Sequence, residues 1–200
     1  LYAIPNVSNQ FTNDGTVRLE SIEPSPNSSG AEFKVENGGP LVNNGTINMA
    51  PGTGGFRVLQ TTVLENYGTM TLSGSTTFAP SSGVYRNRGT LTVASGGTLT
   101  LISGQTFEQL AGTLSVADDV AFQLRDIDFY GFPRFTFLGG TIQQGTVVVL
   151  NGTVSLSSSA TGRGHFTTWG GCTLEGEIGP SHTVVVEGSN RGVGSATLNT

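Results

Sequence analysis

The 200-residue chain has little charge, a single cysteine and no long apolar run. Only 12% of its residues are charged, and nine Lys and Arg against fourteen Asp and Glu give a net charge of −5. This scarcity of basic residues argues against nucleic acid as a partner, because phosphate backbones are bound by clustered Lys and Arg. The lone Cys172 excludes an internal disulfide and a cysteine metal centre. Without an apolar run of about 18 residues, the sequence predicts no membrane insertion.

Glycine, in contrast, is abundant, with 30 residues in the chain. That is about twice its usual share, and glycine, threonine and serine all form helices poorly. The hydrophobic content of 36% argues against a disordered chain. We therefore expect a single all-β domain over residues 1–200, built from short strands and many turns.

A nine-residue motif, in which Φ is an apolar residue, repeats along the first half of the chain. It reads Φ-x-Asn-x-Gly-Thr-Φ-x-Φ and occurs at 11–19, 41–49, 64–72 and 85–93, with a degenerate copy at 107–116. Within one period, residues 89–93 and 97–101 alternate apolar with polar side chains, and 105–107 begin a third strand. Three short strands per coil of about 22 residues predict a right-handed parallel β-helix. Some nine coils would give a rod of roughly 40 Å.

The alternation also predicts which side chains face inward. Leu64, Met70 and Leu72 are expected in the core, with the motif asparagine at a corner. One asparagine per coil would form a hydrogen-bonded ladder, whose members are Asn13, Asn43, Asn66 and Asn87. The glycines beside them are expected to supply positive φ. The alternative for the asparagines is ligand contact or glycosylation, since Asn44 and Asn151 begin sequons.

The residues beside the ladder face outward and form a candidate binding platform. Tyr67 and Arg88 would lie one strand apart, as would Glu65 and Arg86. An exposed aromatic ring can stack on a sugar while neighbouring charges bind its hydroxyls. The structural alternative is a cation–π contact and a surface ion pair. Trp169, between small residues, is a further candidate if it faces outward rather than into the core.

Residues 117–136 depart from the repeat and are expected to form an irregular excursion. They contain several acidic and aromatic side chains, among them Asp118, Asp119, Asp126, Asp128 and Tyr130. Such acids could bind calcium or act as an acid–base pair on a polysaccharide, and Tyr130 could contact sugar. The plainer interpretation is a loop in which Arg125 and Arg134 pair with the acids. No catalytic triad or pair of metal-binding histidines is apparent, so we expect no catalytic residues and no cofactor apart from calcium.

The Asn-x-Gly-Thr-Φ-x-Φ repeat resembles those of bacterial secreted right-handed β-helices, such as adhesin and autotransporter passenger domains. The resemblance covers residues 11–116 well and 137–200 loosely. It implies a secreted or cell-surface bacterial protein attached to other domains. The chain is also similar in character to β-helical carbohydrate-binding modules of secreted xylan-degrading enzymes.

Together these features favour a non-catalytic module that binds a neutral polysaccharide, such as xylan, on a flat face of the rod. One alternative is a structural or adhesive stalk segment of a bacterial surface protein. The other is a polysaccharide lyase or hydrolase acting at residues 117–136. A polysaccharide is the expected partner in the first and third cases.

Overall fold

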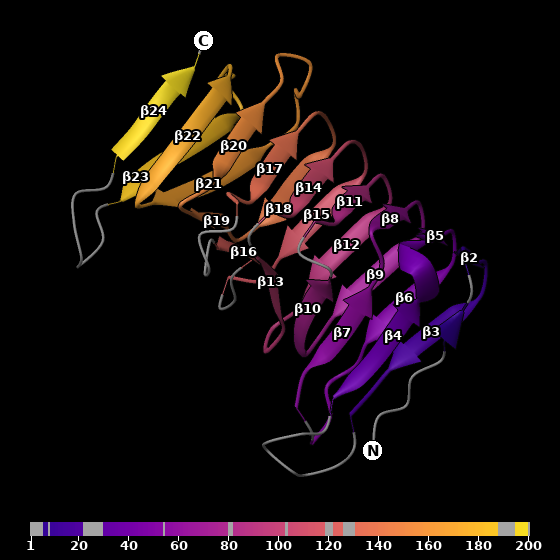
Figure 1. Ribbon diagram of the computed structural model, residues 1–200. Helices are drawn as coiled ribbons and strands as arrows, with labels where there is room; N and C mark the ends of the chain where they lie inside the picture. The colour runs from indigo at the N-terminus through magenta and orange to yellow at the C-terminus, as the bar shows by residue number, and fades with distance from the viewer. Residues whose placement is uncertain are drawn as a thin grey trace.

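The computed structural model is a rod of stacked coils, with the two ends of the chain at opposite ends of the rod (Figure 1). It describes residues 6–7, 9–21, 30–53, 55–79, 82–102, 104–118, 122–125, 131–187 and 195–199. The fold is a β-solenoid whose successive turns are about 23 residues apart. The described residues include no helix with the length and apolar character needed to cross a membrane.

Three parallel sheets run along the rod. Sheet A contains β1 (Asn6–Val7), β4 (Ala31–Val35), β7 (Arg57–Gln60), β10 (Ser75–Ala79), β13 (Thr98–Ile102), β16 (Phe122–Arg125), β19 (Val147–Leu150), β21 (Gly164–Trp169) and β23 (His182–Glu187). Sheet B contains β2 (Phe11–Asn13), β5 (Pro40–Asn43), β8 (Val63–Asn66), β11 (Val84–Asn87), β14 (Thr106–Gln109), β17 (Arg134–Phe137), β20 (Thr153–Leu156), β22 (Gly171–Gly176) and β24 (Ser195–Asn199). Sheet C contains β3 (Thr16–Leu19), β6 (Thr46–Met49), β9 (Thr69–Leu72), β12 (Thr90–Val93), β15 (Thr113–Val116) and β18 (Thr141–Gln144). A three-residue 3₁₀ turn, η1 (Glu36–Gly38), precedes β5.

The first six coils supply one strand to each sheet, and the later ones supply strands to sheets A and B only. Each strand pairs in register with its counterpart in the next coil, so equivalent positions form columns along the rod. In sheet B, for example, Leu64 pairs with Tyr85 and Tyr85 with Phe107. This register gives most inward apolar positions an apolar neighbour in the next coil, with exceptions such as Phe137, which pairs with Gln109.

The core follows the alternation predicted from the sequence. Leu64, Met70 and Leu72 are all buried, at 2% exposure or less. Aromatic rings fill the middle of the rod, where Phe107 stacks on Phe135 with a centroid distance of 5.5 Å. No coil encloses its apolar row alone, and stacking is what removes these side chains from water.

The motif asparagines form a buried ladder at the corner between sheets B and C. The amide of Asn13 donates to Asn43 Oδ1 at 2.7 Å, Asn43 donates to Asn66, and Asn66 donates to Asn87, the latter two also at 2.7 Å. Gln109 extends the ladder by accepting from Asn87 at 2.9 Å. Each amide thus links one coil to the next and is satisfied inside the protein.

The glycines beside the ladder have a different role from the one expected. Among the motif glycines only Gly112, in the degenerate copy, has a positive φ, and Gly45, Gly68 and Gly89 do not. A Cβ on Gly68 or Gly89 would instead lie 2.1 Å from the carbonyl oxygen of the equivalent glycine one coil earlier. The carbonyl oxygen of Gly45 accepts a hydrogen bond from the amide of Thr69, and that of Gly68 accepts one from the amide of Thr90. Glycine is therefore required at these positions because the coils approach closely.

The described residues of the segment 117–136 include the strand β16 and the first three residues of β17. β16 pairs in register with β13 on one side and β19 on the other, and its Phe122 is fully buried. Phe132, in contrast, is 67% exposed. The rod therefore continues through this segment in sheet A.

The core register predicts a sharp contrast between neighbouring residues of β12. Leu91 is buried and Thr92, the next residue, faces outward and is half-buried. Leu91→Asp should abolish folding, because a carboxylate in an apolar column has no partner. Thr92→Asp should leave the far-UV CD spectrum and the cooperative melt intact. Equal behaviour of the two variants would contradict the register.

The asparagine ladder predicts a large effect for a small side chain. Asn66→Ala removes the amide that Asn43 and Asn87 bond to, leaving buried polar atoms without partners. We expect a loss of about 2–4 kcal/mol in unfolding free energy, measured by urea denaturation. Asn44→Ala, at an exposed position beside the ladder, should change stability by less than about 0.5 kcal/mol.

Candidate functional site

The outward face of sheet B carries an ion-pair ladder across three strands. Arg86 of β11 binds Glu65 of β8 at 2.8 Å and Glu108 of β14 at 2.7 Å. These hydrogen bonds raise the pKa of the Arg86 guanidinium. Arg86 thus has a carboxylate on each side and joins three consecutive coils.

Tyr67 lies beside this ladder, as the sequence spacing predicts. The guanidinium carbon of Arg88 is 5.8 Å from the centroid of the Tyr67 ring, and Arg88 Nε is 3.7 Å from Glu65. The four platform residues therefore come together on neighbouring coils. Tyr67 is 51% exposed, but both arginines already have partners within the chain. A sugar bound here would compete with these contacts.

Arg134 does not contact an acid of the 117–136 segment among the described residues. It binds Glu175 instead, at 2.5 and 3.2 Å, reaching from β17 past β20 to β22. The hydrogen bonds from Arg134 lower the pKa of the Glu175 carboxyl below its ordinary value of 4.5.

This pair predicts a pH-dependent contribution to stability. Because the pKa of Glu175 is lowered in the folded protein, the stabilisation is complete above the unfolded value near 4.5 and is lost as the pH falls through the folded pKa. Arg134→Gln should therefore melt below the wild type at pH 7, and the difference should disappear in acid. Glu175→Gln is the matched control and should show the same loss at pH 7. If the difference in melting temperature between Arg134→Gln and the wild type persisted unchanged in acid, the Arg134–Glu175 ion pair could not be its source.

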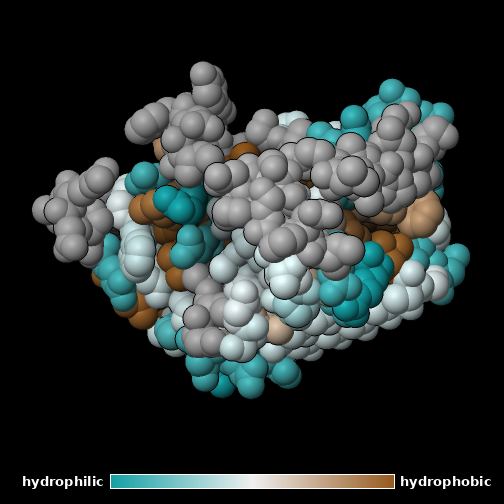
Figure 2. Space-filling model, turned by 90° about the horizontal axis from the view of Figure 1, so that it is seen from below, coloured by the Kyte–Doolittle hydropathy of each residue, from teal (hydrophilic) through white to brown (hydrophobic). Residues whose placement is uncertain are grey.

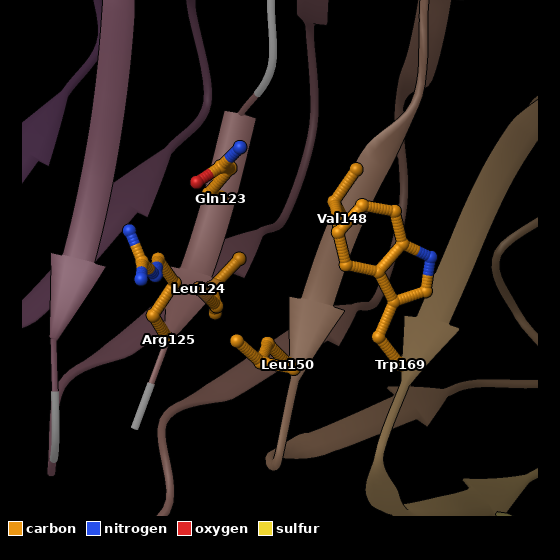
Figure 3. Close-up of a pocket in the computed structure, with 6 residues that line it drawn as sticks. All are labelled: Gln123, Leu124, Arg125, Val148, Leu150 and Trp169. Carbon is orange, nitrogen blue, oxygen red and sulfur yellow. The ribbon is translucent and has the colours of Figure 1, made fainter. Parts of the chain in front are cut away.

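A hollow on the outward face of sheet A brings together residues from β16, β19 and β21 (Figure 3). Its volume is about 240 Å³, and it is lined by Gln123, Leu124, Arg125, Val148, Leu150 and Trp169. The Trp169 ring lies on one side, Gln123 and Arg125 on the other, and aliphatic side chains between them. Arg125, Leu150 and Trp169 are register partners, so the first and last lie two strands, about 10 Å, apart.

Trp169 faces outward rather than into the core. It is 39% exposed, and its indole Nε1 donates to Glu187 at 2.6 Å, which fixes one edge of the ring. The backbone at this strand end is held by Cys172, whose thiol donates to the Trp169 carbonyl oxygen at 3.3 Å. Burial raises the pKa of that thiol, so it stays neutral at pH 7. The ring is therefore both accessible and held in place.

A second hollow adjoins the first on the same face. It is about 490 Å³ in volume, more polar, and lined by Asp118, Gln144, Gly145, Thr146, Val148, Arg163 and His165. Val148 lines both hollows. Within the second, Thr146 and His165 are joined by a hydrogen bond of 3.0 Å.

Of the acids considered for calcium or catalysis, Asp118 lies at the second hollow. Asp119, Asp126 and Asp128 lie outside the described residues, as does Tyr130. In the part of the chain that the structure describes, no three His, Cys, Asp or Glu side chains are grouped so that they could hold a metal ion.

Comparisons of the chain with protein-family models, curated proteins and solved structures found no match. The interpretation of the surface therefore depends on its own chemistry. Apolar side chains, brown in Figure 2, lie in patches among hydrophilic and intermediate ones on the face seen there. Two places on the surface combine an exposed aromatic ring with polar groups, namely the Tyr67 platform and the Trp169 hollow.

Apart from Trp169, the lining of the sheet A hollow was not predicted from the sequence. Its signal was the run Val147–Leu150, in which the outward positions Val148 and Leu150 are apolar as well as the inward ones. A strand with apolar residues on both faces indicates an apolar patch on the outside of the rod. Placing Arg125 and Trp169 beside that patch also needs the register of β16 and β21, which the irregular spacing of these coils conceals.

Proposed function

We propose that this protein is a non-catalytic, polysaccharide-binding module of a secreted bacterial protein, and that its main sugar site is the Trp169 hollow on sheet A. The observation that carries the proposal is the accessible indole ring, fixed by Glu187, over an apolar floor with an amide and a guanidinium opposite. Sugar sites commonly combine an aromatic or apolar surface with a few polar groups that fix orientation.

The chemistry of the lining suits a sugar ring. The apolar C–H face of a pyranose can lie against Trp169 and Leu150, while Gln123 and Arg125 can bond hydroxyl groups. Neither Gln123 nor Arg125 has a side-chain partner among the described residues. The Tyr67 platform offers an exposed ring too, but its guanidinium groups are already bound to carboxylates. Tyr67 is therefore a secondary site in this proposal.

The proposal predicts that Trp169→Ala weakens retardation of the protein in polysaccharide-containing native gels by several-fold. Loss of one aromatic contact is worth roughly 1 kcal/mol, which gives an effect of this size. Xylan, cellulose, mannan and homogalacturonan form a suitable panel. Trp169→Phe should retain part of the retardation, because the ring's face is kept.

Tyr67→Ala is the matched control, since it removes a similarly exposed ring on a different part of the rod. It should reduce retardation less than Trp169→Ala does. The reverse order would move the main site to the Tyr67 platform, and no retardation on any polysaccharide would contradict the function. Reducing-sugar release that Asp118→Asn abolishes would replace it with a hydrolase or lyase.

A structural or adhesive stalk is the second candidate. The Glu65–Arg86–Glu108 ladder favours it, because these outward charges join consecutive coils instead of being left for a ligand. The rod shape suits both a stalk and a binding module. The gel experiment distinguishes them, because a protein that is only a stalk should show no retardation that depends on Trp169.

A further inference from the structure

Two arginines differ from the other described arginines in having neither burial nor a carboxylate partner. Arg18, Arg86, Arg88 and Arg134 each form an ion pair. Arg57 is buried at 2% exposure. Arg125 and Arg163 are exposed, and no described carboxylate lies within ion-pair distance of either.

These two arginines lie on the same face, one at each hollow of sheet A. Arg125 lines the Trp169 hollow and Arg163 lines the polar one, with Val148 shared between them. From Thr146, just before β19, the lining residues Thr146, Val148 and Leu150 cover about 13 Å in the strand direction. The two hollows thus adjoin at Val148 and together extend parallel to the strands over more than the length of a single sugar ring; we call the pair of hollows the groove.

We propose that this groove binds a polysaccharide that carries carboxylate groups, with Arg125 and Arg163 each binding a uronic acid. The inference rests on the proposed function and specifies its ligand. A guanidinium group is suited to a carboxylate, which it can bind through two parallel hydrogen bonds. The net charge of −5 disfavours an acidic ligand at long range, so binding would depend on the local placement of these two guanidinium groups. The chain would lie across the rod, with Arg125 toward one end of the groove and Arg163 toward the other.

Asp118 is the one acid that lines this groove among the described residues, and it is exposed in the same hollow as Arg163. Its carboxylate opposes an acidic ligand. Removing that charge should therefore strengthen binding, whereas a purely structural role for Asp118 would not predict this direction. The groove thus offers substitutions with opposite expected effects.

The test uses the whole chain and two named ligands, glucuronoxylan and homogalacturonan, each compared with its carboxyl-reduced form. The wild type should be retarded more by at least one acidic polymer than by its reduced form, and added salt should diminish that difference. Arg125→Gln with Arg163→Gln should lower the affinity for the acidic polymer roughly tenfold, because each exposed ion pair contributes modestly. Asp118→Asn should raise it.

Arg18→Gln is the matched control, since it removes an exposed guanidinium that is paired with Glu20 and lies far from the groove in the first coil. It should bind the acidic polymer as the wild type does. Equal retardation of the wild type by acidic and reduced forms would overturn the inference while leaving polysaccharide binding in place. So would unchanged binding of the double variant. Absence of binding to every polysaccharide would contradict the proposed function itself.

Discussion

The structure depends on the close stacking of each coil on the one before. Backbone hydrogen bonds fix the coil spacing near 4.8 Å. Each side chain must therefore fit against the equivalent side chain of the next coil at that distance. At Gly68 and Gly89 even a methyl group would collide with the previous coil's carbonyl oxygen. At Asn66 the same spacing allows one amide to bond the next. The repeat motif thus contains residues that can stack on their own equivalents at this distance.

The stacking constraint explains why the fold could be predicted from the sequence. The motif residues repeat because they meet their equivalents, so the inward columns, the asparagine ladder and the pairing of Glu65 with Arg86 all follow from alignment of the coils. The role of the glycines could not be predicted in the same way. A positive φ and a close approach both require glycine, and the sequence alone does not tell which of the two applies at Gly45 and Gly68.

The candidate site, in contrast, does not arise from the stacking of equivalent residues. Along the regular coils, the outward charges are largely joined to one another, as Arg86 is to Glu65 and Glu108. Where the repeat becomes irregular, the outward face of sheet A gains apolar residues, an accessible indole and two guanidinium groups that pair with no carboxylate of the described residues. Register could not be extended to this region from sequence alone, because the spacing between coils changes there. The proposed ligand surface therefore lies where the repeat in the sequence is least regular.

The proposed sugar site requires that a sugar chain contact Trp169 in the sheet A hollow. The chain has one tryptophan, so its selectively excited fluorescence reports on this hollow alone. Titration with glucuronoxylan oligosaccharides should change the emission intensity or wavelength in a saturable manner, at the concentrations that retard the protein in gels. Binding of these oligosaccharides without any change in tryptophan emission would contradict the account.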